Sequence, residues 1–74
     1  MKLIGRVEGR CGTRMLILRC DPAQLPRLYA DAVDRNMRPV GRVMDIFGNI
    51  KAPYASILCR APCDIQPGEK IFAK

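Results

Sequence analysis

Residues 39–54 read PVGRVMDIFGNIKAPY, and the first nine of them decide the fold class. Their side chains divide into two faces on the two-residue period of a β-strand. Val40, Arg42, Met44 and Ile46 fall on one face, and the other face carries Gly41, Val43, Asp45 and Phe47. A glycine in mid-strand predicts a bulge or a sharp bend of the kind that barrel corners need. Gly48 and Asn49 then end the strand.

Five more short strands are predicted on either side of this one, at residues 3–8, 14–20, 28–34, 54–59 and 70–73. In the first of them, alternation places Leu3 and Val7 on one face and Ile4 on the other. Residues 15–18 of the second are all apolar, so that strand is buried on both faces or covers a partner on one. Residues 28–34 would also suit a helix, but the preceding Pro26 and the short span favour a strand.

Turn-forming residues separate these strands, and no helix, internal repeat or linker is evident. The sequence predicts turns at 10–13, at 35–38 and at 64–69, the last around Pro-Gly. In the second of these turns, Asn36 is the residue most tolerant of a positive φ. Two prolines between residues 21 and 26 exclude a central strand there, which makes this stretch a loop.

The chain has 74 residues, which is enough for one small domain. A domain of this size cannot bury both faces of a flat six-stranded sheet. Closing the sheet buries one face and removes the exposed strand edges. We therefore expect a single domain over residues 1–74, of the all-β class, folded as a small six-stranded antiparallel β-barrel.

The charge balance is basic, with 13 Lys and Arg against 7 Asp and Glu and a net charge of +6. The cations recur along the whole chain, which indicates a solvated basic surface or sequence-independent contact with RNA. No apolar run reaches the roughly 18 residues of a membrane span, and charge interrupts the N-terminus too early for a secretory signal. We expect a cytoplasmic protein that binds neither a membrane nor a small molecule.

The residue types do not predict an enzyme. There is no His, and the carboxylates are scattered, so neither a catalytic constellation nor a cofactor site is expected. The four cysteines, whose spacing lacks the close pairs of a zinc knuckle, leave three readings open. The alternatives are buried free thiols, one or two disulfides, and a metal site with four thiolate ligands. The four residues concerned are Cys11, Cys20, Cys59 and Cys63.

Residues 40–54 are more apolar than one face of a barrel strand can absorb. Val43 and Phe47 lie on one predicted face while Met44 and Ile46 lie on the other, and the apolar character continues through the following loop to Tyr54. These side chains either close the open end of the barrel or contact another protein.

The same segment resembles the archaeal form of the GAR-type (Gar-one) subunit of H/ACA ribonucleoproteins, which guide pseudouridylation of RNA. The matching run is Val40-Gly41-Arg42-Val43-Met44-Asp45-Ile46-Phe47-Gly48, followed by Lys51 and Pro53-Tyr54. The likeness extends over residues 33–36, Ile4-Gly5-Arg6-Val7 and the closing residues 67–72. Asn49 stands where the family usually has Pro, and Met37 where it usually has Gly.

The resemblance implies a barrel, similar to the barrel domain of translation elongation factors, that docks on a dyskerin-type pseudouridine synthase. In that family the subunit has no catalytic residue; it interacts with the mobile loop over the synthase active site and aids substrate turnover. Guide RNA and the other proteins of the particle are then indirect partners. Carried over by position, the docking residues are Ile46, Phe47, Gly48, Ile50, Pro53 and Tyr54, with Val43, Met44 and Tyr29 as additions. Cations expected near RNA are Arg35, Arg38, Arg42 and Lys51.

Two other functions remain open from the residues alone. One is a stand-alone basic RNA-binding barrel of ribosomal or translational type. The other is a barrel adaptor unconnected to RNA.

Overall fold

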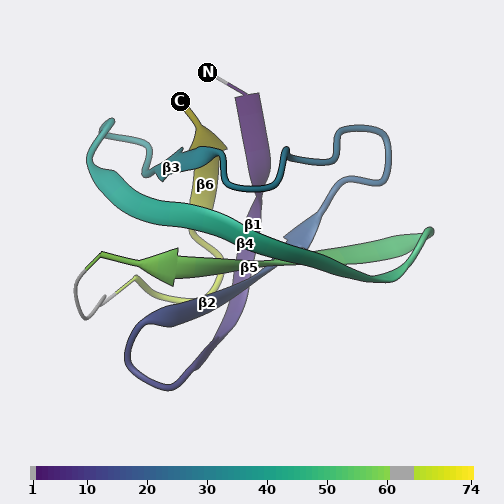
Figure 1. The fold of residues 1–74 in the computed structure, drawn as a ribbon, viewed down its shortest axis with the longest axis horizontal. Helices are drawn as coiled ribbons and strands as arrows, with labels where there is room; N and C mark the ends of the chain where they lie inside the picture. The colour runs from purple at the N-terminus through teal and green to yellow at the C-terminus, as the bar shows by residue number, and fades with distance from the viewer. Residues whose placement is uncertain (1, 61–64) are drawn as a thin grey trace.

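The computed structural model describes residues 2–60 and 65–74, and these residues form a closed antiparallel β-barrel (Figure 1). No helix in this part of the chain is long and apolar enough to cross a membrane. The strands run in the ring order β1-β2-β5-β4-β3-β6, which confirms the predicted all-β six-stranded barrel. Their bounds are β1 (Lys2–Cys11), β2 (Met15–Cys20), β3 (Asp31–Val33), β4 (Pro39–Asn49), β5 (Ala52–Cys59) and β6 (Lys70–Ala73).

The core lies inside the ring. Its largest fully buried side chains come from five of the six strands: Ile4, Leu16, Leu18, Val43, Ile57 and Ile71. Because every strand pairs with a neighbour on both sides, the ring has no open edge in its sheet.

The two halves of the barrel have the same topology, which the sequence did not lead us to expect. The β1–β2 hairpin is matched by β4–β5, and the β1–β6 pairing is matched by β4–β3. The registers also correspond, because Gly5 lies opposite Cys20 as Gly41 lies opposite Cys59. Each hairpin then has a register shift two residues further along, before Gly9 in one and before Asp45 in the other. The expectation of no internal repeat is therefore wrong at the level of structure.

Two glycines allow neighbouring strands to cross closely where the barrel bends. A Cβ atom on Gly5 would overlap the carbonyl oxygen of Arg19, and one on Gly41 would overlap that of Leu58. Neither glycine has a positive φ, so close approach is the reason for glycine at both places. The prediction of a bend at Gly41 is thus supported, with Val40 as the unpaired residue between the Ala32–Gly41 and Val33–Pro39 pairs.

The matching irregularity in β1 overturns the predicted faces of that strand. Ile4 has no partner between the Leu3–Phe72 and Gly5–Ile71 pairs of β1 with β6. This extra residue shifts the alternation, so that Ile4 and Val7 are both buried whereas Leu3 is exposed. Strict alternation had placed Leu3 with Val7.

Several strand ends also differ from the prediction. The third strand covers only Asp31–Val33, because Tyr29 has a φ of 65° and interrupts the extended backbone. In contrast, β4 continues to Asn49 and β5 begins at Ala52, so the connection between them is a tight turn. The Asn49 side chain stabilises that turn by accepting hydrogen bonds from the backbone N–H groups of Lys51 (2.7 Å) and Ala52 (3.0 Å).

The turn predicted at 10–13 begins later than expected, because β1 continues to Cys11 and the turn covers residues 12–14. The turns predicted at 35–38 and 64–69 are present. In the β3–β4 turn, the positive φ falls on Met37 (66°) instead of Asn36. In the last turn, Gly68 has a φ of 94°, as the Pro-Gly sequence predicts. The first residue predicted for that turn, Asp64, lies outside the described residues.

Replacing Gly41 tests the close approach that closes the barrel. We expect Gly41→Ala to lower the free energy of unfolding by about 2 kcal/mol, because the new methyl group would force β4 away from β5. Gly9→Ala is the matched control, since nothing lies within 4 Å of a Cβ at that position. Denaturant unfolding of both variants measures the difference, and equal effects would contradict the role assigned to Gly41.

Candidate protein-docking surface

The β4–β5 hairpin carries a stacked aromatic pair on the outside of the barrel. Phe47 and Tyr54 lie directly opposite each other in the register. Their ring centroids are 6.0 Å apart with an interplanar angle of 20°. Such a pair is worth about 0.5–1.5 kcal/mol beyond the area that it buries, and it holds both rings in a fixed orientation.

Aliphatic side chains extend the exposed area around this pair. Phe47 is 44% exposed, Met44 is also exposed, and Ile50 at the tip of the hairpin is 88% exposed. We call Met44, Phe47, Ile50 and the half-buried Tyr54 the hairpin surface. Scattered apolar side chains are normal on a protein surface, but a group that surrounds a stacked aromatic pair is typical of a contact site.

Three of the residues predicted for docking do not belong to this surface. Val43 is 0% exposed and lies in the barrel core, and Pro53 is also buried. Ile46 is half-buried and packs against the core from the barrel interior. Val43 is therefore removed from the docking set, and Pro53 and Ile46 lie beneath the hairpin surface. The remaining loop residue, Gly48, is exposed with a φ of 93°.

Outward-facing apolar side chains also lie on β5 and β2, which the sequence analysis missed. The outward positions form rows across the strands, in which Ser56 lies between Ile17 and Asp45, and Leu58 lies between Met15 and Arg42. Ser56 is only 6% exposed although it faces outward, because its neighbours cover it. The signal in the sequence was the run at 15–18, apolar on both faces, for which covering a partner was one of two readings.

A loop brings a third aromatic residue close to β4. The loop between β2 and β3 carries the exposed side chains of Leu25, Leu28 and Tyr29. The backbone N–H of Tyr29 donates to the carbonyl of Val43 at 2.6 Å, and Val43 donates in turn to the carbonyl of Ala30 at 3.0 Å. These bonds fix the backbone of Tyr29 beside Val43 of β4.

Tyr29 holds a backbone conformation that favours glycine. Its φ of 65° lies in the left-handed region, and its side chain is 63% exposed. The equivalent residue in the other half of the barrel is Gly68. Its N–H donates to the carbonyl of Val7, as the N–H of Tyr29 donates to the carbonyl of Val43. An L side chain in this region costs about 1–2 kcal/mol, and an exposed ring returns little of that by burial. The tyrosine is thus better explained by what its side chain contacts than by the fold.

Comparing the two halves of the barrel distinguishes the shared backbone from the side chains that occur in only one half. The positions of Phe47 and Tyr54 correspond to Cys11 and Met15 in the β1–β2 hairpin. Both hairpins therefore have the same backbone, but the aromatic pair and the strained tyrosine occur in only one half. This asymmetry places the candidate surface on β4, β5 and the loop before β3.

The four cations predicted to lie near RNA do not form one site. Arg42 lies on the side of the barrel and pairs with Asp31 at 3.4 Å, an exposed ion pair of small energetic value. Lys51 lies at the hairpin tip. Arg35 and Arg38 lie on the β3–β4 turn, at the opposite end of β4.

The three described cysteines are Cys11, Cys20 and Cys59. Cys11 is exposed and Cys20 is buried, both as free thiols, which excludes a disulfide through either of them. Cys59 is also buried, while Cys63 lies outside the described residues. Cys20 and Cys59 lie at opposite ends of the β2–β5 pairing, and within residues 2–60 and 65–74 no group of three or more potential ligands gathers.

No protein-family model matches this chain, and the search of curated proteins found no sequence similar to it. The surface chemistry of the barrel is therefore what bears on its function.

Exchanging Tyr29 for two small residues tests the strain. We expect Tyr29→Gly to be more stable than Tyr29→Ala by about 1 kcal/mol, because only glycine relieves the left-handed backbone. Leu28 is the control, since its φ is not positive. There the order should reverse, with Leu28→Ala more stable than Leu28→Gly. Thermal unfolding measures all four variants, and the same order at both positions would contradict strain at Tyr29.

Thiol labelling tests the positions of the cysteines. Burial raises the pKa of the Cys20 thiol, which lowers its thiolate fraction, while Cys11 is open to solvent. We expect iodoacetamide to modify Cys11 at least about tenfold faster than Cys20 in the folded protein. Peptide mass spectrometry assigns each site, and urea should make the two rates similar. Equal rates without urea would contradict the burial of Cys20.

Proposed function

We propose that this barrel is a non-catalytic subunit of an H/ACA ribonucleoprotein and that it docks on a dyskerin-type pseudouridine synthase through the hairpin surface. The observation that carries the proposal is the stacked Phe47–Tyr54 pair on the outer face of a hairpin whose counterpart in the other half lacks it. The pair lies within the segment that resembles the GAR-type subunits, residues 40–54.

The chemistry of the hairpin surface suits protein contact. Interface hot spots are enriched in aromatic residues, which contribute a large apolar area with few rotatable bonds. Stacking fixes the ring of Phe47 against that of Tyr54 before binding, so little side-chain entropy is lost on association. The exposed side chain of Ile50 extends the apolar contact beyond the turn.

Docking of this kind supports a regulatory mechanism. A barrel that binds one position of a mobile loop more tightly than another shifts the loop toward that position. If the favoured position is the open one, product leaves the synthase faster, and turnover rises without any chemical group from the barrel. The differential affinity for the two loop positions sets the size of the effect.

Binding to the isolated synthase tests the proposal. The barrel and an archaeal dyskerin-type synthase are mixed without RNA at high salt, where contacts between charges are screened but apolar contacts persist. We expect co-elution, and we expect Tyr54→Ala to cost about 2 kcal/mol of binding, or roughly a 30-fold loss of affinity. Phe47→Ala should have a similar effect.

Met37→Ala is the matched control for these variants. Met37 is exposed and apolar, as Phe47 is, but it lies on the β3–β4 turn at the other end of β4. Its replacement should leave the affinity unchanged. A loss below about 0.5 kcal/mol on Tyr54→Ala would remove that residue from the docking set. Absence of any complex, with salt-sensitive binding to guide RNA instead, would favour the stand-alone RNA-binding barrel.

A further inference from the structure

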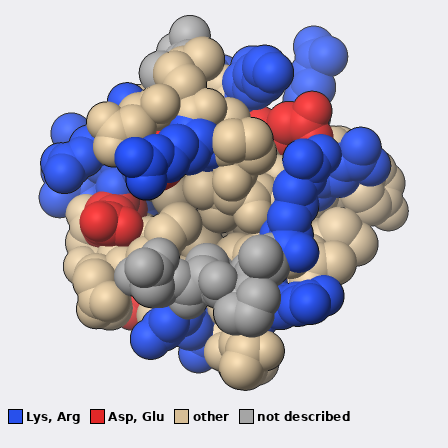
Figure 2. Space-filling model, turned by 90° about the vertical axis from the view of Figure 1, so that its left-hand side faces the viewer, with Lys and Arg blue, Asp and Glu red and all other residues tan. Residues whose placement is uncertain are grey.

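The end of the barrel away from the hairpin tip is rich in unpaired cations. Arg35 and Arg38 lie on the β3–β4 turn, Arg60 follows β5, and Lys70 begins β6. All four are exposed, and we call them the basic end. Figure 2 shows this side of the molecule, with Lys and Arg side chains around a hollowed centre.

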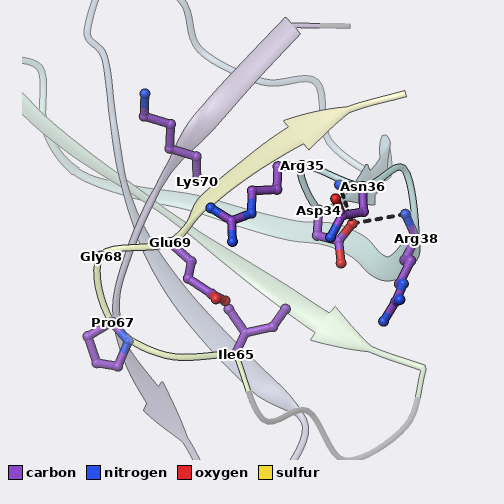
Figure 3. A pocket seen from close by; sticks show the side chains of 9 residues that line it. All are labelled: Asp34, Arg35, Asn36, Arg38, Ile65, Pro67, Gly68, Glu69 and Lys70. Atoms are coloured by element: carbon purple, nitrogen blue, oxygen red, sulfur yellow. Dashed lines mark hydrogen bonds between the residues drawn. The ribbon is translucent and has the colours of Figure 1, made fainter.

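Two hollows lie on either side of the β3–β4 turn. The larger has a volume of about 730 Å³ and lies between this turn and residues 65–70, with Arg35, Arg38 and Lys70 in its lining (Figure 3). The smaller, of about 100 Å³, is lined by Arg60 and Met37 among others. In Figure 3 the Arg35 side chain reaches toward the middle of the larger hollow, whereas that of Lys70 points away from it.

The two described carboxylates that line the larger hollow accept hydrogen bonds from the backbone. Asp34 accepts hydrogen bonds from the N–H groups of Asn36 (2.8 Å) and Arg38 (3.0 Å). Glu69 accepts one from the N–H of Gln66 at 3.3 Å. The single ion pair among the described residues joins Arg42 to Asp31, so none of the four cations of the basic end has an ion-pair partner there.

The described residues that line the two hollows include five cations, which are the four of the basic end and Lys74, and three carboxylates, Asp31, Asp34 and Glu69. The excess positive charge attracts an anion. Three of the four cations of the basic end are arginines, whose planar guanidinium groups match the geometry of a phosphate. The described residues that line the larger hollow include no aromatic ring on which a base could stack. The chemistry therefore fits the phosphates of a nucleic-acid strand and gives no means of reading its bases.

We propose that the basic end binds the phosphodiester backbone of a nucleic-acid strand without sequence preference, with the strand along the rim formed by Arg35, Arg38 and Arg60. Glu69 faces the larger hollow from the opposite wall, which keeps the strand on the arginine side. The site is separate from the hairpin surface, and it does not depend on the docking proposed above.

The test uses the barrel alone and a fluorescently labelled 15-nucleotide single strand, with binding followed by anisotropy over a series of salt concentrations. We expect the affinity to fall steeply with salt, by a logarithmic slope of about 0.7 for each phosphate contacted. The triple variant Arg35→Ala/Arg38→Ala/Arg60→Ala should lose about 2 from that slope and at least about tenfold in affinity at low salt.

A second triple variant removes the same charge from another part of the surface. Arg6→Ala/Arg19→Ala/Arg27→Ala replaces exposed arginines of β1, β2 and the following loop. It should keep the slope nearly unchanged, with a loss of less than about threefold. Equal losses in the two triples would overturn the proposal, because binding would then follow net charge alone. Melting temperatures of both variants show that each is folded.

Two further arms test the position and the chemistry of the strand. Glu69→Gln removes from the larger hollow a negative charge that repels phosphate, and it should tighten binding by about twofold. DNA and RNA of the same sequence should bind within about threefold of each other, because the sugar is not read. A preference of about tenfold or more for either strand, or weaker binding by Glu69→Gln, would overturn the site as proposed. Because no synthase is present, these results are independent of whether the hairpin surface docks.

Discussion

The close crossing of strands at Gly5 and Gly41 is the constraint on which the rest of this structure depends. At each place a backbone carbonyl of the neighbouring strand occupies the space that a Cβ would need. A chain of this size can bury enough apolar surface only if its sheet bends sharply and closes. The two glycines permit the bend, and the unpaired residues Ile4 and Val40 beside them turn the alternation so that both are buried.

Because the two halves share this device, they also provide an internal standard for deciding what each surface residue does. A feature present in both halves is explained by barrel closure, as the Gly–Cys pairs are. A feature present in only one half needs another explanation. Phe47 with Tyr54, and Tyr29 in the position that Gly68 fills in the other half, are features of this second kind. All three lie on β4, β5 or the loop that is hydrogen-bonded to β4, which favours a single contact surface.

The fold class was predictable because it depends on short-range patterns: two-residue alternation, turn residues at regular intervals, and a length that demands closure. The repeat was not, because its trace in the sequence is only Ile4-Gly5-Arg6-Val7 and Val40-Gly41-Arg42-Val43. The face on which a side chain lies next to a bulge was not predictable either, since one unpaired residue reverses the alternation, as it does at Leu3. For the candidate site, Phe47 and Tyr54 followed from the apolar pattern of residues 40–54 and from the resemblance carried by that segment. Leu58 and Ile17 join the site only through the pairing of distant strands.

The two proposed surfaces lie at opposite ends of a barrel whose longest dimension is 30 Å. The hairpin surface is apolar, so its contacts persist at high salt, whereas the basic end is cationic and its contacts weaken with salt. A ligand of one surface therefore does not compete for the other. Every strand between them is hydrogen-bonded to a neighbour on both sides, so the barrel holds the two surfaces at a fixed separation. Bound by its hairpin to a protein, such a barrel would hold the phosphates of a strand at a fixed distance from that protein. Its contribution would then be geometric, because the barrel would set the distance between the two bound partners.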